Sequence, residues 1–448
     1  MAQAGDSADP ESAPSPPGYG RGAAILSAGI GATGLVTYGY FALASHTLSE
    51  ADYGGITLLW SAVFITVSVL YRPVEQLLSR TIAERDATAA EGNSHLRVAG
   101  TIQLVLGVVF AALALLFRRP LEDDLFEGST TLYTVLVVTV LAYAVSYFAR
   151  GYLAGSRRFG LYGALVLMEA VSRILFALAV AVGIASGQSV VALGIAAAPI
   201  VSLAVVPFAL GRVPKAPPAP AAEQAPAEAE FTLANGSGFA LAVLGIMVAE
   251  QTFLNAGPLL VKATEGAEGT ALAGFAFNVL LIARAPLQLF QSVQTSILPH
   301  LTRLGARGET DPFRRSVNVT LLAIAAFAAA VALVMLAAGP TVMDLVFGGE
   351  FEYDRLGLVL ISIGMGLYLA AATLNQALLA RSQARAASAA WLASAAVFVA
   401  FLVLLDFEDR VLQVEVGYVG AAALLSGALL ALYRRGHGQA PGSGRAST

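Results

Sequence analysis

About twelve apolar runs, separated by short polar segments, follow one another along this chain and limit the folds open to it. Each run is near the roughly 20 residues that an α-helix needs to cross a bilayer. The runs also lack the strict apolar and polar alternation of a membrane strand. Of the 448 residues, 57% are hydrophobic and 12% are charged, which is too apolar for one soluble core. We therefore expect an all-α polytopic membrane protein.

The spacing of the runs predicts two lobes of six helices each. We expect the first lobe over 22–210 and the second over 233–433, separated by a flexible linker at 211–232 that is rich in Pro, Ala and Glu. The expected helices are 22–44, 55–78, 98–117, 130–154, 160–186, 189–210, 233–261, 270–298, 317–339, 356–380, 386–405 and 415–433.

The two ends of the chain and the basic residues predict an orientation. Residues 1–21 are rich in Pro, Ser and Gly, so we expect a disordered tail, and 434–448 form a second tail. With the N-terminus inside, inner segments hold 17 Lys and Arg and outer loops hold 5. This bias predicts a multi-pass protein of the cytoplasmic membrane with both termini in the cytoplasm.

Composition and motifs exclude several classes of function. The net charge of -4 argues against nucleic-acid binding, and the absence of cysteine excludes disulfides and thiol chemistry. No zinc-protease or P-loop motif occurs, and no segment outside the runs is long enough for a catalytic domain. We expect neither an enzyme nor a bound cofactor or metal. Transport is the class that remains, with a receptor or an assembly factor as competitors.

Ionisable residues within the runs are the candidate site residues, because such groups are costly in lipid and face a cavity or a partner. The second run carries Ser61, Ser68, Arg72 and Glu75 along one helical stripe, and the eighth carries Arg284, Gln288 and Gln291. Similar Arg–Pro segments at 72–73 and 284–286 also suggest a parallel repeat of the two halves. Both stripes indicate a watery cavity between the lobes, and Pro73 and Pro286 indicate kinks there.

Arg72, Arg284 and Arg173 would make this cavity cationic, which suits a phosphorylated cargo because arginine donates two hydrogen bonds at once. Two alternatives stay open at this point. Arg72 lies late in its run, so its side chain could instead snorkel to the inner interface. Arg173 could be neutralised by Glu169, which lies one helical turn before it.

The seventh run carries Glu250 and Asn255, and here too two interpretations are open. A carboxylate in a low dielectric is easily protonated, so Glu250, like Glu169, is a candidate for coupling transport to a proton or sodium gradient. Alternatively, the pair forms a hydrogen-bonded node between helices. A stripe of Tyr143, Tyr147 and Arg150 is interpreted as part of an interfacial belt.

Four stretches carry a resemblance to a known family: Leu48–Gly54, Arg72–Ala83, Arg284–Arg303 and Leu345–Phe351. In order and spacing they resemble the polysaccharide transporters (oligosaccharide flippases) of the multidrug/oligosaccharidyl-lipid/polysaccharide (MOP) flippase superfamily, over roughly 22–433. The resemblance implies a V-shaped, MATE-like arrangement of two six-helix lobes. It also implies the flipping of an oligosaccharide on a polyprenyl (pyro)phosphate for surface polysaccharide synthesis. Membrane lipids, a polysaccharide polymerase and glycosyltransferases are the implied partners, and Arg72 and Arg284 are implied phosphate ligands.

Other functions compete with this one. A wall-precursor (lipid II) flippase is disfavoured because the first run has no arginine after Arg21. A cation-coupled multidrug exporter of the same fold would use Glu250 and needs no anion clamp. A major-facilitator transporter is disfavoured because 79–97 lack that family's basic motif. A non-transporting membrane scaffold would keep the fold with a sealed interior.

Overall fold

The computed structural model describes residues 19–87, 93–210, 233–284, 310–348, 352–381 and 383–435, and these ranges are helical apart from short connections. The predicted all-α class is confirmed, since the described ranges contain no strand. The predicted domain boundaries near 1–21, 211–232 and 434–448 fall largely outside these ranges and stay predictions.

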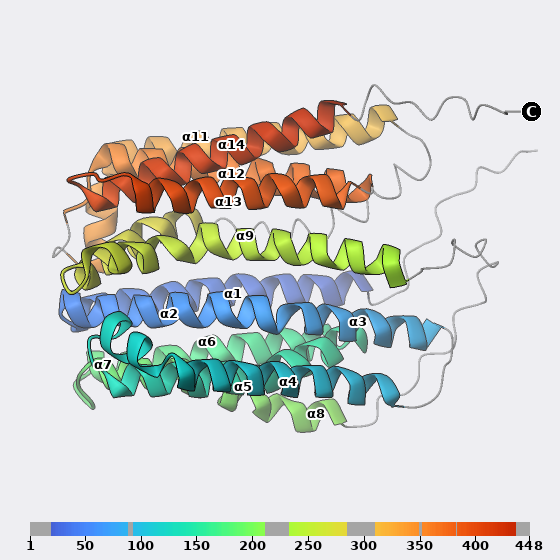
Figure 1. The fold of residues 1–448 in the computed structure, drawn as a ribbon, viewed down its shortest axis with the longest axis horizontal. Helices are drawn as coiled ribbons and strands as arrows, with labels where there is room; N and C mark the ends of the chain where they lie inside the picture. Colours follow the sequence, from blue (N-terminus) through green and yellow to red (C-terminus); the bar gives the residue numbers. More distant parts are fainter. Residues whose placement is uncertain are drawn as a thin grey trace, which may run out of the picture.

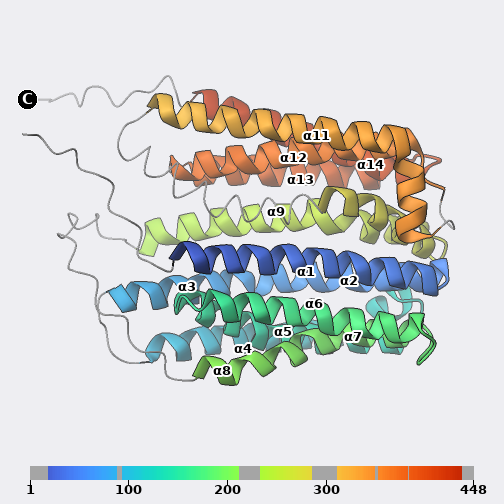
Figure 2. The same cartoon turned by 180° about the vertical axis from the view of Figure 1, so that it is seen from behind.

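The helices form two bundles that lie side by side (Figures 1 and 2). The N-terminal bundle contains α1 (Tyr19–Thr47), α2 (Glu50–Leu70), α3 (Arg72–Ala87), α4 (Ser94–Leu116), the π-helix η1 (Pro120–Leu125), α5 (Thr130–Gly155), α6 (Phe159–Ala181), α7 (Gln188–Ser202), the 3-10 helix η2 (Leu203–Val205) and α8 (Val206–Leu210). The C-terminal bundle contains α9 (Leu233–Glu265), an unlabelled helix at Gly269–Arg284, α11 (Thr310–Phe347), α12 (Arg355–Ala380), α13 (Ala384–Leu404) and α14 (Arg410–Arg435). We call the end where α1 begins and α14 ends the terminal end, and the opposite end the distal end.

The helices match the predicted spans in number and order. Ten described helices are long and apolar enough to cross a membrane, and Gly269–Arg284 is a shorter apolar helix at the start of the predicted eighth span. The 29-residue α1 covers the predicted first span. The rest of the eighth span, with Pro286, Gln288 and Gln291, lies outside the described residues.

The outer faces of the helices are apolar, as lipid requires. Along α4, Leu104, Val105 and Val108 are 68%, 54% and 60% exposed. In water such a surface would be a strong aggregation site, but in hydrocarbon it is the solvated face. Buried polar side chains point inward instead, and Gln103 on the same helix donates to the carbonyl of Ala144 at 2.6 Å.

The predicted end of the ninth span at residue 339 is wrong. Helix α11 is 38 residues long and continues through Pro340 to Phe347. Proline interrupts one backbone hydrogen bond, but neighbouring helices can hold a bent helix together in a membrane. The last turns of α11 run across the other helices at the distal end (Figure 2). They bring Gly348 to the side chain of His46 at the end of α1.

Next to Pro73, where a kink is predicted, the helix is interrupted at Tyr71, between α2 and α3. Proline has no N–H, so the carbonyl of Val69 loses its usual helical partner. The chain continues in nearly the same direction, because the Tyr71 N–H bonds to Val67 and the Tyr71 carbonyl accepts from Glu75 at 3.0 Å. The break leaves Arg72 at the start of a new helix.

Helices α3 and α5 approach closely because two glycines of α5 face α3. A Cβ atom on Gly151 would lie 2.9 Å from the carbonyl oxygen of Glu75. One on Gly155 would lie 2.7 Å from Ile82 Cβ and 2.8 Å from the Ser79 carbonyl oxygen. This small-residue contact fixes α3, and therefore Arg72 and Glu75, against the N-terminal bundle.

Substitution Gly155→Ala should lower the thermal stability of the protein in detergent or nanodiscs. The added methyl meets backbone and a β-branched side chain, and such overpacking costs about 1–3 kcal/mol. Gly420→Ala is the matched control, because a Cβ there would meet nothing within 4 Å. A melting curve in which both variants match the wild type would contradict this packing.

Candidate functional site

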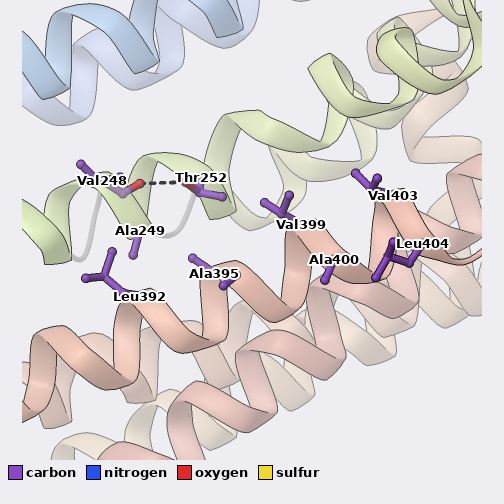
Figure 3. A pocket seen from close by; sticks show the side chains of 10 residues that line it. Val248, Ala249, Thr252, Leu392, Ala395, Val399, Ala400, Val403 and Leu404 are labelled. Atoms are coloured by element: carbon purple, nitrogen blue, oxygen red, sulfur yellow. Dashed lines mark hydrogen bonds between the residues drawn. The ribbon is translucent and has the colours of Figure 1, made fainter.

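Two grooves on the described part of the chain are apolar, and neither contains an ionisable side chain. One, of about 540 Å³, lies between α9 and α13 (Figure 3), and the other, of about 490 Å³, lies between α4 and α5. The first is lined by Val248, Ala249, Thr252, Leu392, Ala395, Ala396, Val399, Ala400, Val403 and Leu404. Such surfaces suit hydrocarbon and cannot bind a charged group. The candidate site is therefore where ionisable groups of the two bundles meet.

Arg72 and Glu250 form an ion pair across the two bundles. The distance from Arg72 Nη1 to Glu250 Oε2 is 3.9 Å, and the side chains are 35% and 30% exposed. The break before Pro73 places Arg72 on the first turn of α3, and α9 supplies Glu250. A contact of this length between half-buried groups is weak enough to be exchanged for another ion. Nearby, Glu75 accepts a hydrogen bond from Tyr162 at 2.8 Å.

Arg284 is the last described residue of its helix and contacts α9. One guanidinium nitrogen donates to the Leu254 carbonyl and, at 3.0 Å, to Asn255 Oδ1. The guanidinium also lies 4.5 Å from the centre of the Phe277 ring. No carboxylate of the described residues pairs with Arg284, and its Nε is buried without a hydrogen-bond partner among them. Arg284 is therefore a cation held by neutral groups.

Asn255 links this arginine to the rest of α9. Its Nδ2 donates to Gln251 Oε1 at 3.0 Å, so the Asn255 oxygen is free to accept from Arg284. Asn255 and Gln251 are 3% and 7% exposed. The hydrogen-bonded node that was one interpretation of this helix does form here, but Glu250 points instead to Arg72.

The alternative in which Glu169 neutralises Arg173 is wrong. Glu169 on α6 binds Arg150 on α5, and its Oε1 also accepts from Ser146 at 2.6 Å. The interpretation of Arg150 as part of an interfacial belt is therefore also wrong, since its side chain is only 12% exposed. Helix packing brings α5 and α6 together, and a pair between helices satisfies both charges with better geometry than one helical turn allows.

Arg173 lies in the core of the N-terminal bundle, without a carboxylate partner among the described residues. Its guanidinium carbon lies 4.6 Å from the centre of the Trp60 ring, and its Nη2 donates to Tyr143 at 3.3 Å. The residue is 3% exposed. The aromatic face partly replaces an anion, which makes Arg173 a structural cation rather than an open ligand here.

The remaining predicted residues separate into two groups. Ser61 is fully buried with no hydrogen-bond partner for its hydroxyl in the described chain, and Ser68 is 6% exposed, so neither lines an open cavity. Gln288 and Gln291 fall outside the described residues.

The candidate ionisable groups of the interface and of the adjoining N-terminal core have a small positive excess. The set comprises Arg72, Arg150, Arg173, Arg284, Glu75, Glu169 and Glu250. Two arginines are neutralised by ion pairs, and a third is held against tryptophan. Arg284 is the cation that an incoming anion could bind without first displacing a carboxylate.

No protein-family model matches the chain, and no curated protein matches it. Solved structures do match. A multidrug resistance MATE family transporter of the MOP superfamily in an inward-facing conformation is 13% identical, with a TM-score of 0.63 over 92% of this chain and 97% of that one. A mutant of the Vibrio cholerae MATE transporter VcmN is 18% identical, with a TM-score of 0.61 over 93% and 97%. The eukaryotic MATE transporter AtDTX14 is 11% identical, with a TM-score of 0.62 over 92% and 95%.

The chain has the MATE fold. The predicted MOP/MATE-like architecture is thereby confirmed over almost the whole chain. A MATE fold does not by itself fix a cargo. At these identities, only the residues between the bundles can indicate the cargo.

Glu169→Gln should destabilise the protein strongly, because it leaves Arg150 buried without its anion. Breaking a buried pair in this way costs about 3–5 kcal/mol. The control is Glu122→Gln, whose partner Arg118 is 53% exposed, and for which we expect little change. Thermal unfolding in nanodiscs measures both, and equal melting temperatures for the two variants would refute a structural role for Glu169.

Proposed function

We propose that this chain is a transporter of the cytoplasmic membrane that moves a polyprenyl-(pyro)phosphate-linked oligosaccharide to the outer leaflet. The two bundles would alternate between openings at either end, as the MATE fold suggests. The observation that carries the choice of cargo is Arg284, a half-buried cation with neutral partners beside the bundle interface. An anionic headgroup supplies the charge that this site lacks.

The ion pair between Arg72 and Glu250 gives the cargo a way to act on both bundles. A phosphate oxygen competes with the Glu250 carboxylate for Arg72, because the 3.9 Å contact is long and half-exposed. Cargo binding would then exchange a contact between the bundles for a contact with the cargo.

The distribution of basic residues supports an orientation with the terminal end in the cytoplasm. At this end lie Arg80, Arg85, Arg97, Arg157, Arg158, Arg314, Arg315, Arg381, Arg385, Arg434 and Arg435. At the distal end, the described residues include Arg118, Arg119, Lys262, Arg355 and Arg410. The excess at the terminal end follows the positive-inside rule.

A second candidate function is a cation-coupled multidrug exporter. It is favoured by the fold shared with an inward-facing multidrug resistance MATE transporter, and by the two carboxylates Glu75 and Glu250 beside Arg72. A cationic drug would bind those carboxylates and be repelled by Arg284. The charge of the cargo, negative or positive, therefore distinguishes the two functions.

Arg284→Gln should reduce the flipping of a lipid-linked oligosaccharide about tenfold to hundredfold, the cost of losing a hydrogen bond to a charged group. The assay uses proteoliposomes with a fluorescent saccharide on polyprenyl pyrophosphate. Arg434→Gln, at the exposed end of α14, is the matched control.

Unchanged flipping by Arg284→Gln would contradict the anion site. Export of a fluorescent cationic dye by the wild type, with no flipping of the saccharide, would establish the second candidate instead. A loss of flipping in both variants would also contradict a specific anion site at Arg284, because the effect would then depend only on the total charge of the protein.

A further inference from the structure

A buried lysine joins the two bundles at the distal end. Lys262 on α9 is 3% exposed, and its Nζ donates to Glu127 Oε1 at 2.6 Å and to Thr270 Oγ1 at 2.7 Å. Thr270 also donates to Glu127. Lys262 and Thr270 belong to the C-terminal bundle, whereas Glu127 lies in the connection between η1 and α5 of the N-terminal bundle. The three groups satisfy one another across the interface.

The backbone around Glu127 is shaped to make this contact. Glu127 has φ of +52°, in the left-handed region that non-glycine residues seldom adopt, and Gly128 follows with φ of +79°. The Gly128 N–H donates to the Glu122 carbonyl at 2.7 Å, which closes the turn. A glycine at 127 would be easier to accommodate in this turn. The glutamate therefore has to be held there by its side chain.

The same end of the molecule is closed by close backbone and side-chain packing. A Cβ atom on Gly54 would lie 1.9 Å from the carbonyl oxygen of Thr270, so only glycine lets α2 approach the helix Gly269–Arg284 this closely. Tyr53 donates to Asn278, and Asn278 donates to Tyr353 at 3.1 Å. These contacts leave no room for a cargo between the bundles at this level.

We propose that Glu127, Lys262 and Thr270 form a latch, which holds the distal end closed and must break before that end can open. The latch rests on the proposed function in one respect, since alternating access is what requires the distal end to open. Its presence and its strength do not depend on which cargo the protein carries.

The two charged side chains of the latch differ in burial, so removing one charge should have a different effect from removing the other. The Lys262 side chain is 2% exposed, whereas that of Glu127 is 42% exposed. Loss of the glutamate charge leaves a buried ammonium that can regain water only if the bundles separate. Loss of the lysine charge leaves a carboxylate that is already half in water. Partial burial tends to raise the pKa of Glu127, but the hydrogen bonds from Lys262 and Thr270 outweigh it and lower the pKa.

The absence of cysteine makes the test direct, since spin labels can be placed at will in the full-length chain. Glu50→Cys on α2 and Glu268→Cys before the helix Gly269–Arg284 would report the distal distance between the bundles by double electron–electron resonance in nanodiscs. In this background Glu127→Gln should raise the ratio of open to closed distal ends by about tenfold or more. Lys262→Met should raise this ratio less, because it removes the same contact but leaves no buried charge behind.

Glu265→Gln is the matched control, since Glu265 pairs with Arg410 at 2.5 Å at the same end but within one bundle. We expect its distance distribution to match the wild type. A closed distribution in Glu127→Gln, or an equal opening in Glu265→Gln, would overturn the latch. If the latch opens as expected while no saccharide is flipped, the proposed cargo fails and the latch stands.

Discussion

A charge inside hydrocarbon has to find a partner, and this requirement decides where the polar residues of the two bundles lie. Arg150 and Glu169 satisfy each other between α5 and α6, in the core of one bundle. Arg173 is held by the face of Trp60 and by Tyr143. These contacts are buried within the N-terminal bundle and stabilise it. Nearer the middle of the interface the pairing differs, since the Arg72–Glu250 contact is 3.9 Å long and Arg284 is held by neutral groups.

The fold could be predicted from the sequence because each membrane span has to be a long apolar run, which is easily recognised. A run of about twenty apolar residues admits few structures other than a helix, since all of its backbone groups must be satisfied internally. The incorrect prediction concerns the end of a helix, which this requirement does not determine. The predicted ninth span stopped at residue 339, just before Pro340, whereas α11 continues through this proline and packs against α1 and α12. The break at Tyr71 was foreseeable because Pro73 removes a specific donor.

The site was only partly predictable, for a related reason. Helical periodicity shows which residues share a face, so the association of Arg72 and Arg284 with the bundle interface could be inferred from stripes. It does not show which helix that face meets. Glu169 was therefore paired with Arg173 one turn away, although α5 supplies Arg150. The polar stripe of Ser146 and Arg150 was present in the sequence and could have indicated this pairing. Nothing in the sequence near Glu127 pointed to Lys262, which lies far along the chain in the other bundle.

The two contacts between bundles that involve charge differ in a way that suits their positions. Arg72 and Glu250 are about one-third exposed and 3.9 Å apart, so either can exchange its partner for water or for an anion at little cost. Lys262 is buried and has contacts of 2.6 and 2.7 Å, so it cannot leave Glu127 unless water reaches it. In the proposed transport cycle, the first contact would therefore respond to what enters between the bundles, while the second would resist opening of the distal end. If the Arg72–Glu250 contact yields before the distal one, the protein admits a cargo before the distal end opens, and the two ends are not open at the same time.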